Sequence, residues 1–388
     1  MPPPGRGLVV VALGSAQTLA WASTYYLPAM LAAPMARDLG LEVPTVFAAF
    51  SFALVISAFV GPQAGRWIDR WGARPVLVAT SLLFAAGLLM LARSHGALGL
   101  FVAWAVLGIG MGSGLYEAAF AGLVRLYGRG ARGAITGITL LAGFASTVGW
   151  PLSTWLEAQF GWRGACLGWA ALHLLIGLPL NACLPRATAP GLDSEAEAGP
   201  LVEPASDSAA LRASVLLSVV FAITWFISTA MAAHLPRLLM AGGATLAAAV
   251  ACGALVGPAQ VAARLLEFGW LRKVHPLLSA RLATLLHPAG AALLGLVGAP
   301  AAAAFVILHG AGNGILTIAK GTLPLVLFGP QGYGHRQGLL MVPARIAQAL
   351  APWLFGICLD RWGAGALWLS ALLGLVAFCA LMVLRRGD

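Results

Sequence analysis

The sequence predicts an all-α polytopic membrane protein with twelve transmembrane helices in two pseudo-symmetric six-helix bundles. Its 388 residues are 60% hydrophobic and 9% charged, with a mean hydropathy of +0.89. A soluble domain carries about 25% charged residues, so this chain cannot cover a water-facing surface. Polar segments divide the sequence into long apolar runs, and the second half repeats features of the first. Helices are expected because long apolar spans satisfy their own backbone hydrogen bonds.

Twelve apolar runs each have about the 20 residues that a bilayer core requires. We read the first run as a retained helix, because it is longer than the apolar region of a signal peptide. The runs are residues 8–31, 45–65, 75–93, 98–120, 134–156, 164–184, 212–233, 244–266, 276–297, 301–325, 338–357 and 365–384.

The repeat predicts two homologous halves. Tyr127-Gly128 corresponds to Phe328-Gly329, Gly137 to Gly338 and Pro151 to Pro352, all at one constant offset. Such a repeat indicates duplication with parallel topology. Residues 186–211 are rich in Pro, Ala, Gly, Ser and acidic residues, which is typical of a flexible linker. We therefore expect bundles at 1–185 and 212–388, joined by a cytoplasmic linker at 186–211.

The charge distribution predicts the orientation. Most of the 23 Lys and Arg residues fall on one side if the N-terminus is cytoplasmic. By the positive-inside rule, both termini are expected in the cytoplasm of a cell whose inner (plasma) membrane holds the protein. The same distribution accounts for the net charge of +10 without nucleic acid as a partner. The five cysteines and seven histidines show no metal-ligand spacing, so no metal or other cofactor is expected.

The densest charge cluster is the stretch from Gly65 to Pro75, between the second and third runs. It predicts a tight polar hairpin at the cytoplasmic edge. There, the Asp69 carboxylate can pair with Arg125 or Arg129, or accept hydrogen bonds from a helix N-terminus. Such contacts suit a gate that opens and closes, although the charges can also serve only to anchor and orient the chain.

This hairpin resembles the signature between helices two and three of the major facilitator superfamily, G-x-x-x-D-R-x-G-R-[RK]. The matching residues are Gly65, Asp69, Arg70, Gly72 and Arg74, while Ala73 replaces one basic position. The resemblance covers essentially the whole chain. It implies a secondary transporter in which two bundles alternate access to a central cavity lined by helices one, four, seven and ten.

Three ionisable residues lie inside predicted spans: Glu117, Lys320 and Arg345. A charge inside a span costs about 2.5–3.5 kcal/mol on insertion scales, so such residues indicate function. Glu117 and Lys320 are each about 12 Å from the cytoplasmic edge at helical rise. We expect the three to share a polar chamber in which Glu117 pairs with Lys320. A static salt bridge between two helices is the alternative.

The two cations outnumber Glu117, which favours an anionic substrate such as a carboxylate held in a bidentate fork. The arrangement is similar to that of oxalate/formate and monocarboxylate carriers, which use basic residues on helices eight and eleven. Arg264 is the corresponding residue of the eighth run, and it either faces the cavity or reaches the membrane interface. Further candidates for substrate binding are Gln17, Tyr25, Tyr26, Trp225 and Asn313. The two tyrosines can equally belong to an interfacial aromatic belt.

The sequence thus predicts a monomeric secondary transporter that moves a small organic anion by alternating access, with protons coupled through Glu117. The alternative is a proton-driven efflux pump for drugs or other lipophilic or cationic compounds. No nucleotide-binding motif is present, so an ion gradient or the substrate gradient is the expected energy source. An enzyme is not expected, because the sequence contains no nucleophile–base pair, metal cluster or cofactor motif.

Overall fold

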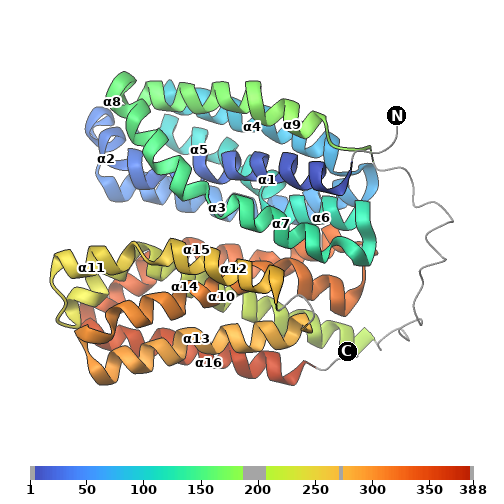
Figure 1. Cartoon of the computed structure of the whole chain (residues 1–388). Helices are drawn as coiled ribbons and strands as arrows, with labels where there is room; N and C mark the ends of the chain where they lie inside the picture. The colour runs from blue at the N-terminus through green and yellow to red at the C-terminus, as the bar shows by residue number, and fades with distance from the viewer. Residues whose placement is uncertain (1–4, 187–206, 271–273, 385–388) are drawn as a thin grey trace.

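The described residues form long helices and no strand. The computed structural model describes residues 5–186, 207–270 and 274–384. Figure 1 shows the helices of the first half of the chain stacked above those of the second half. The predicted all-helical membrane fold is therefore confirmed, and the chain is a multi-pass membrane protein.

The first half contains α1 (Arg6–Ser23), α2 (Leu27–Leu39), α3 (Val43–Trp71), α4 (Ala73–Ala92), α5 (Gly96–Gly114), α6 (Tyr116–Tyr127), α7 (Arg132–Ala142), α8 (Ala145–Leu172) and α9 (Leu178–Ala182). The second half contains α10 (Asp207–Ala241), α11 (Leu246–Gly253), α12 (Val256–Gly269), α13 (Pro276–Val297), α14 (Ala302–Phe328), α15 (Tyr333–Trp362) and α16 (Ala366–Val383).

Nine continuous helical stretches of the described chain are long and apolar enough to cross a membrane. Two of them, Gly96–Ala182 and Tyr333–Val383, are 87 and 51 residues long. Since one crossing needs about 20 residues, each has room for more than one crossing. The number of twelve crossings stays a prediction.

Both ends of the described chain lie at one end of the molecule. In Figure 1, α1 begins and α16 ends at the right, whereas α2 and α11 lie at the left. We call the end of the molecule where α1 begins and α16 ends the N/C end, and the opposite end the far end. Most of the predicted linker, residues 187–206, lies outside the described residues, and α10 already begins at Asp207.

The polar stretch from Gly65 to Pro75 is more helical than the predicted hairpin. Helix α3 continues through it to Trp71, and α4 begins two residues later. The turn between them is Gly72, whose φ of 85° favours glycine. The helix persists because Ala64, Gly65 and Ile68 are buried, while Arg66 and Arg70 face out.

Glycines of α5 allow its close approach to α3. A Cβ at Gly108 would lie 2.6 Å from the carbonyl oxygen of Ala53, and one at Gly112 would lie 2.7 Å from that of Ser57. Both neighbours are backbone atoms, which cannot move aside cheaply. Small residues thus pack these two helices together, as is common in membranes.

We predict that Gly108→Ala destabilises the protein, because the added methyl group would force α5 away from α3. The loss is about 1–3 kcal/mol, the usual cost of overpacking. Gly257→Ala is the matched control, since a Cβ there meets no atom within 4 Å. Thermal unfolding in detergent measures both. Equal melting temperatures for the two variants would contradict this account of the packing.

Candidate functional site

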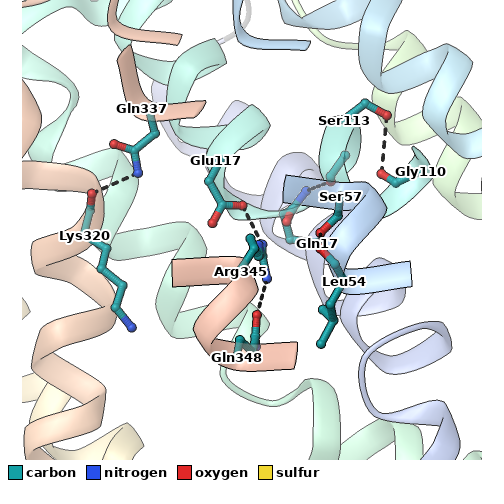
Figure 2. A network of polar contacts seen from close by, with 11 residues as sticks. Gln17, Leu54, Ser57, Gly110, Ser113, Glu117, Lys320, Gln337, Arg345 and Gln348 are labelled. Atoms are coloured by element: carbon teal, nitrogen blue, oxygen red, sulfur yellow. Dashed lines mark hydrogen bonds and ion pairs between the residues drawn. The ribbon is translucent and has the colours of Figure 1, made fainter. Parts of the chain in front are cut away.

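A buried ion pair joins the two halves at the centre of the molecule. Arg345 of α15 donates from Nη2 to Oε2 of Glu117 on α6, at 2.9 Å. The Arg345 and Glu117 side chains are 4% and 15% exposed. Arg345 also donates from Nη1 to Oε1 of Gln348 at 2.9 Å, which holds the guanidinium in place (Figure 2).

A helix break positions Glu117. The path from α5 to α6 is interrupted at Leu115, whose φ and ψ are −84° and −163°, so Glu117 falls in the first turn of α6. The positive end of the helix dipole favours a carboxylate there. On the other side of the break, the Gly114 carbonyl accepts a hydrogen bond of 2.7 Å from Nε2 of Gln17. Gln17 therefore supports the break that orients Glu117.

Lys320 is not the partner of Glu117 that we expected. Its ammonium lies 4.1 Å from the centroid of the Trp225 ring, and Figure 2 shows no bond between it and Glu117. The Arg345 guanidinium lies 5.4 Å from the same ring. All three charges gather around Trp225, because its ring lies against Lys320 and Arg345, and Arg345 binds Glu117. The carboxylate binds Arg345 instead.

Aromatic side chains from both halves surround these charges. Trp21 stacks on Trp225 with a centroid distance of 6.2 Å and an interplanar angle of 6°. Tyr25, Tyr26 and Tyr116 lie within 6.4 Å of Trp21 by the same measure. Tyr25 and Tyr26 thus lie beside the central charges instead of facing lipid. Tyr25 also reaches α10 through its hydroxyl, 3.3 Å from Oγ1 of Thr229.

Arg264 is buried between the halves and does not reach the membrane interface. It is 4% exposed and donates from Nη1 to the Thr139 carbonyl of α7 at 3.0 Å. Asn313 is placed differently: it lines a cavity inside the second half, away from the ion pair.

Several buried donors around the centre have no hydrogen-bond partner among the described residues. They are Nε1 of Trp21 and of Trp225, Nε of Arg264 and Nε2 of Gln348. The Oε1 atom of Gln17 is an unpartnered acceptor. A small pocket beside the ion pair is lined by Ser57, Ala58, Gly61, Gly112, Glu117, Gly338, Met341 and Arg345. The centre therefore has more donors than its own acceptors satisfy.

The N/C end is closed by contacts between α3 and α15. Asp69 accepts hydrogen bonds from the backbone nitrogens of Gly334 (2.9 Å) and His335 (2.8 Å) in the first turn of α15. A carboxylate is stabilised there by both the free N–H groups and the helix dipole. A Cβ on Gly65 would overlap the Gly334 backbone, so glycine is needed for this approach.

The predicted arginine partner of the Asp69 carboxylate is not seen. Arg125 donates instead to the backbone carbonyls of Asp69 and Arg70 at the end of α3. Arg70 lies over the Trp71 ring, at 5.7 Å, and Arg74 is half-buried in the first turn of α4. Of the two alternatives for Asp69, the helix N-terminus is the one observed.

An ion pair that the sequence did not reveal adds to this closure. Arg132 of α7 donates to Glu267 of α12 at 2.9 Å and to the Val274 carbonyl, also at 2.9 Å. Glu267 is only 4% exposed. It could have been noticed as an acidic residue just beyond the apolar run 244–266, but its partner lies in the other half of the chain. The Arg132–Glu267 pair and the contacts of Asp69 together hold the two halves in contact at the N/C end.

Comparison with known proteins identifies the family. Residues 13–323 match the model of the Major Facilitator Superfamily. The chain belongs to this superfamily. It is therefore a membrane transporter that binds a small-molecule substrate, and not an enzyme.

Curated relatives within the superfamily include monocarboxylate transporter 11. The human protein is 29% identical over 363 residues, covering 84% of this chain and 74% of the relative. The mouse protein is 30% identical over 366 residues, covering 84% and 78%.

Solved structures share the fold at low identity. The fucose transporter FucP, in the outward conformation, has a TM-score of 0.74 at 15% identity, covering 96% of this chain and 97% of that one. The human organic anion transporter MFSD10 has a TM-score of 0.68 at 18% identity, covering 98% and 100%.

We predict that Asp69→Asn opens the N/C end, because the neutral side chain loses the charge that the N-terminus of α15 favours. The readout is maleimide labelling of Ser57→Cys, which lines the pocket beside Glu117, in a cysteine-free background. Labelling should become about 10-fold faster, which corresponds to a loss of roughly 1.4 kcal/mol from the free energy that favours the closed state. Asp360→Asn is the control, since Asp360 pairs with Arg237 within the second half. An unchanged rate for Asp69→Asn would show that this contact does not hold the closure.

Proposed function

We propose that this superfamily member is a secondary active transporter for a small organic anion, most simply a carboxylate, with protons coupled through Glu117. It works as a monomer by alternating access of its two bundles in the inner membrane. Both termini lie in the cytoplasm, so the N/C end is the cytoplasmic end. The described state is then the one closed toward the cytoplasm.

The observation that carries the proposal is the excess of cations and unpartnered donors around one carboxylate. Arg345, Lys320 and Arg264 outnumber Glu117 three to one among the central charges. Unpartnered buried donors are costly, and a bound anion would satisfy several of them at once. A carboxylate is well suited, because its two oxygens match the planar fork of Arg345.

The ion pair supplies a route for coupling. An anion that binds Arg345 competes with the Glu117 carboxylate for the same guanidinium. Once displaced, Glu117 would be a lone buried charge, which is avoided when it takes up a proton. Substrate and proton then bind together. The loaded centre has the same net charge as the empty one, because the bound anion replaces the Glu117 carboxylate as the partner of Arg345.

The names of the relatives agree with this substrate class. Two curated relatives are named monocarboxylate transporters, and one solved neighbour is named an organic anion transporter. Two other neighbours, FucP and XylE, are described as proton symporters. The proton gradient is accordingly our proposed energy source.

We predict that proteoliposomes take up simple carboxylates and that Arg345→Gln abolishes this uptake. The variant keeps a polar side chain but removes the fork that holds the anion. Uptake should fall at least about 100-fold, as for loss of a buried charge pair worth about 3 kcal/mol or more. Arg237→Gln, which breaks a salt bridge at the protein surface, should leave uptake unchanged. Transport of a lipophilic cation without any carboxylate would instead favour the efflux alternative.

We also predict that Glu117→Gln separates exchange from accumulation. Glutamine can neither bind nor release the coupled proton, so accumulation driven by an inward proton gradient should be lost. Counterflow exchange of labelled for unlabelled substrate needs no net proton movement and should persist. Gradient-driven accumulation at the wild-type rate would remove Glu117 from the coupling role.

A further inference from the structure

Two buried histidines form a polar chain in the second half, outside the central site. The Nδ1 atoms of His287 on α13 and His309 on α14 lie 3.0 Å apart. On its other side, Nε2 of His287 lies 3.0 Å from Oγ of Ser370 on α16. The histidines are 6% and 4% exposed. The chain therefore links three helices inside the bundle.

The hydrogen-bond directions in this chain follow from Ser370. Its hydroxyl donates to the Leu367 carbonyl at 2.7 Å, so its oxygen is free to accept from Nε2–H of His287. A neutral imidazole carries only one N–H, so Nδ1 of His287 is an acceptor. Nδ1 of His309 must then be the donor. This leaves Nε2 of His309 as an acceptor with a free lone pair.

A small cavity adjoins this pair. Its polar lining comes from His287, His309, Thr224, Ser228, Thr284 and Asn313, and the rest of its lining is apolar. The hydroxyls of the two threonines already donate to the carbonyls of Phe221 (3.2 Å) and Arg281 (2.8 Å). Their oxygens thus have only lone pairs to offer. These oxygens and the free lone pair of His309 are the acceptors that a proton-donating species would meet in the cavity.

Apart from the two histidines, no titratable side chain lines this cavity in the described chain. The other described titratable groups on the helices packed around the pair form contacts elsewhere or lie along other parts of those helices. They are Arg212, His234 and Arg237 on α10, Cys252 on α11, Arg264 and Glu267 on α12, Arg281 on α13, Lys320 on α14 and Cys379 on α16. No fixed cation therefore competes with a charge placed on the pair.

We propose that His309 and His287 form a binding site for one proton, separate from Glu117. Hydronium in the cavity donates to Nε2 of His309: one O–H bond breaks, one N–H bond forms, and water remains. The Nδ1–H···Nδ1 bond shares the resulting positive charge with His287. Since an isolated imidazolium is costly in a dry bundle, the proton is held while the cavity contains water.

The position of the pair makes it independent of the central ion pair. His309 and Lys320 are on the same side of α14, eleven residues or about 16 Å apart at helical rise. His309 lies toward the far end and Lys320 toward the N/C end. The histidine pair is thus displaced from the central charges toward the far end, so a proton on it does not depend on which anion the central site binds.

The test is nuclear magnetic resonance of the protein with ¹⁵N-labelled histidine in lipid nanodiscs, without substrate. As the pH is lowered from about 8 to about 5, the range in which histidine responds, the His287 and His309 signals should move together. In His287→Gln, the His309 signal should move at a different pH. If the signals of both residues keep the chemical shifts of neutral imidazole over the whole pH range, the proposal is overturned.

His173 provides the matched control. It is also buried and lies 2.7 Å from a serine hydroxyl, that of Ser23, but it does not line this cavity. Its signal should not move over the same range. If His173 moves together with the pair, or if the pair responds to Na⁺ at constant pH, the cavity is not a specific proton site. Neither readout requires transport, so the outcome is independent of the proposed anion substrate.

Discussion

The buried ion pair between Glu117 and Arg345 is the interaction on which the rest of the arrangement depends. It joins α6 of the first half to α15 of the second, across the interface that a transporter must open and close. Removing either partner would leave an uncompensated buried charge, which costs about 3–5 kcal/mol. A substrate that offers its own carboxylate can release the pair without that cost. Our proposal of an anionic substrate therefore rests on the charge balance of this interface.

Both helices also carry contacts at the N/C end. The first turn of α15 donates to Asp69, eleven residues before Arg345. On α6, Arg125 holds the end of α3 and lies eight residues after Glu117. We infer that a change in the ion pair reaches the closure along α15, because this helix carries both Arg345 and the backbone nitrogens that donate to Asp69. Arg132 and Glu267 add a second connection on α7 and α12.

Apolar periods and intramembrane charges were sufficient to predict the helical membrane fold and the chamber that contains Glu117, Lys320 and Arg345. The partner of Glu117 was predicted wrongly, because spacing along a helix reports depth but not which side chain reaches across. Glu267 and the histidine pair were missed as contacts for the same reason: each partner lies in a distant part of the chain. The break at Leu115 also depends on tertiary contacts, since Gln17 satisfies the carbonyl that the break exposes.

The central claim is that an anion and a proton bind together because the anion displaces Glu117 from Arg345. The most direct measurement is proton uptake by the purified protein when a transported carboxylate is added, followed with a pH indicator in weak buffer. Linkage predicts uptake of about one proton per bound anion by the wild-type protein, and of none by Glu117→Gln. Anion binding without proton uptake by the wild-type protein would contradict the account.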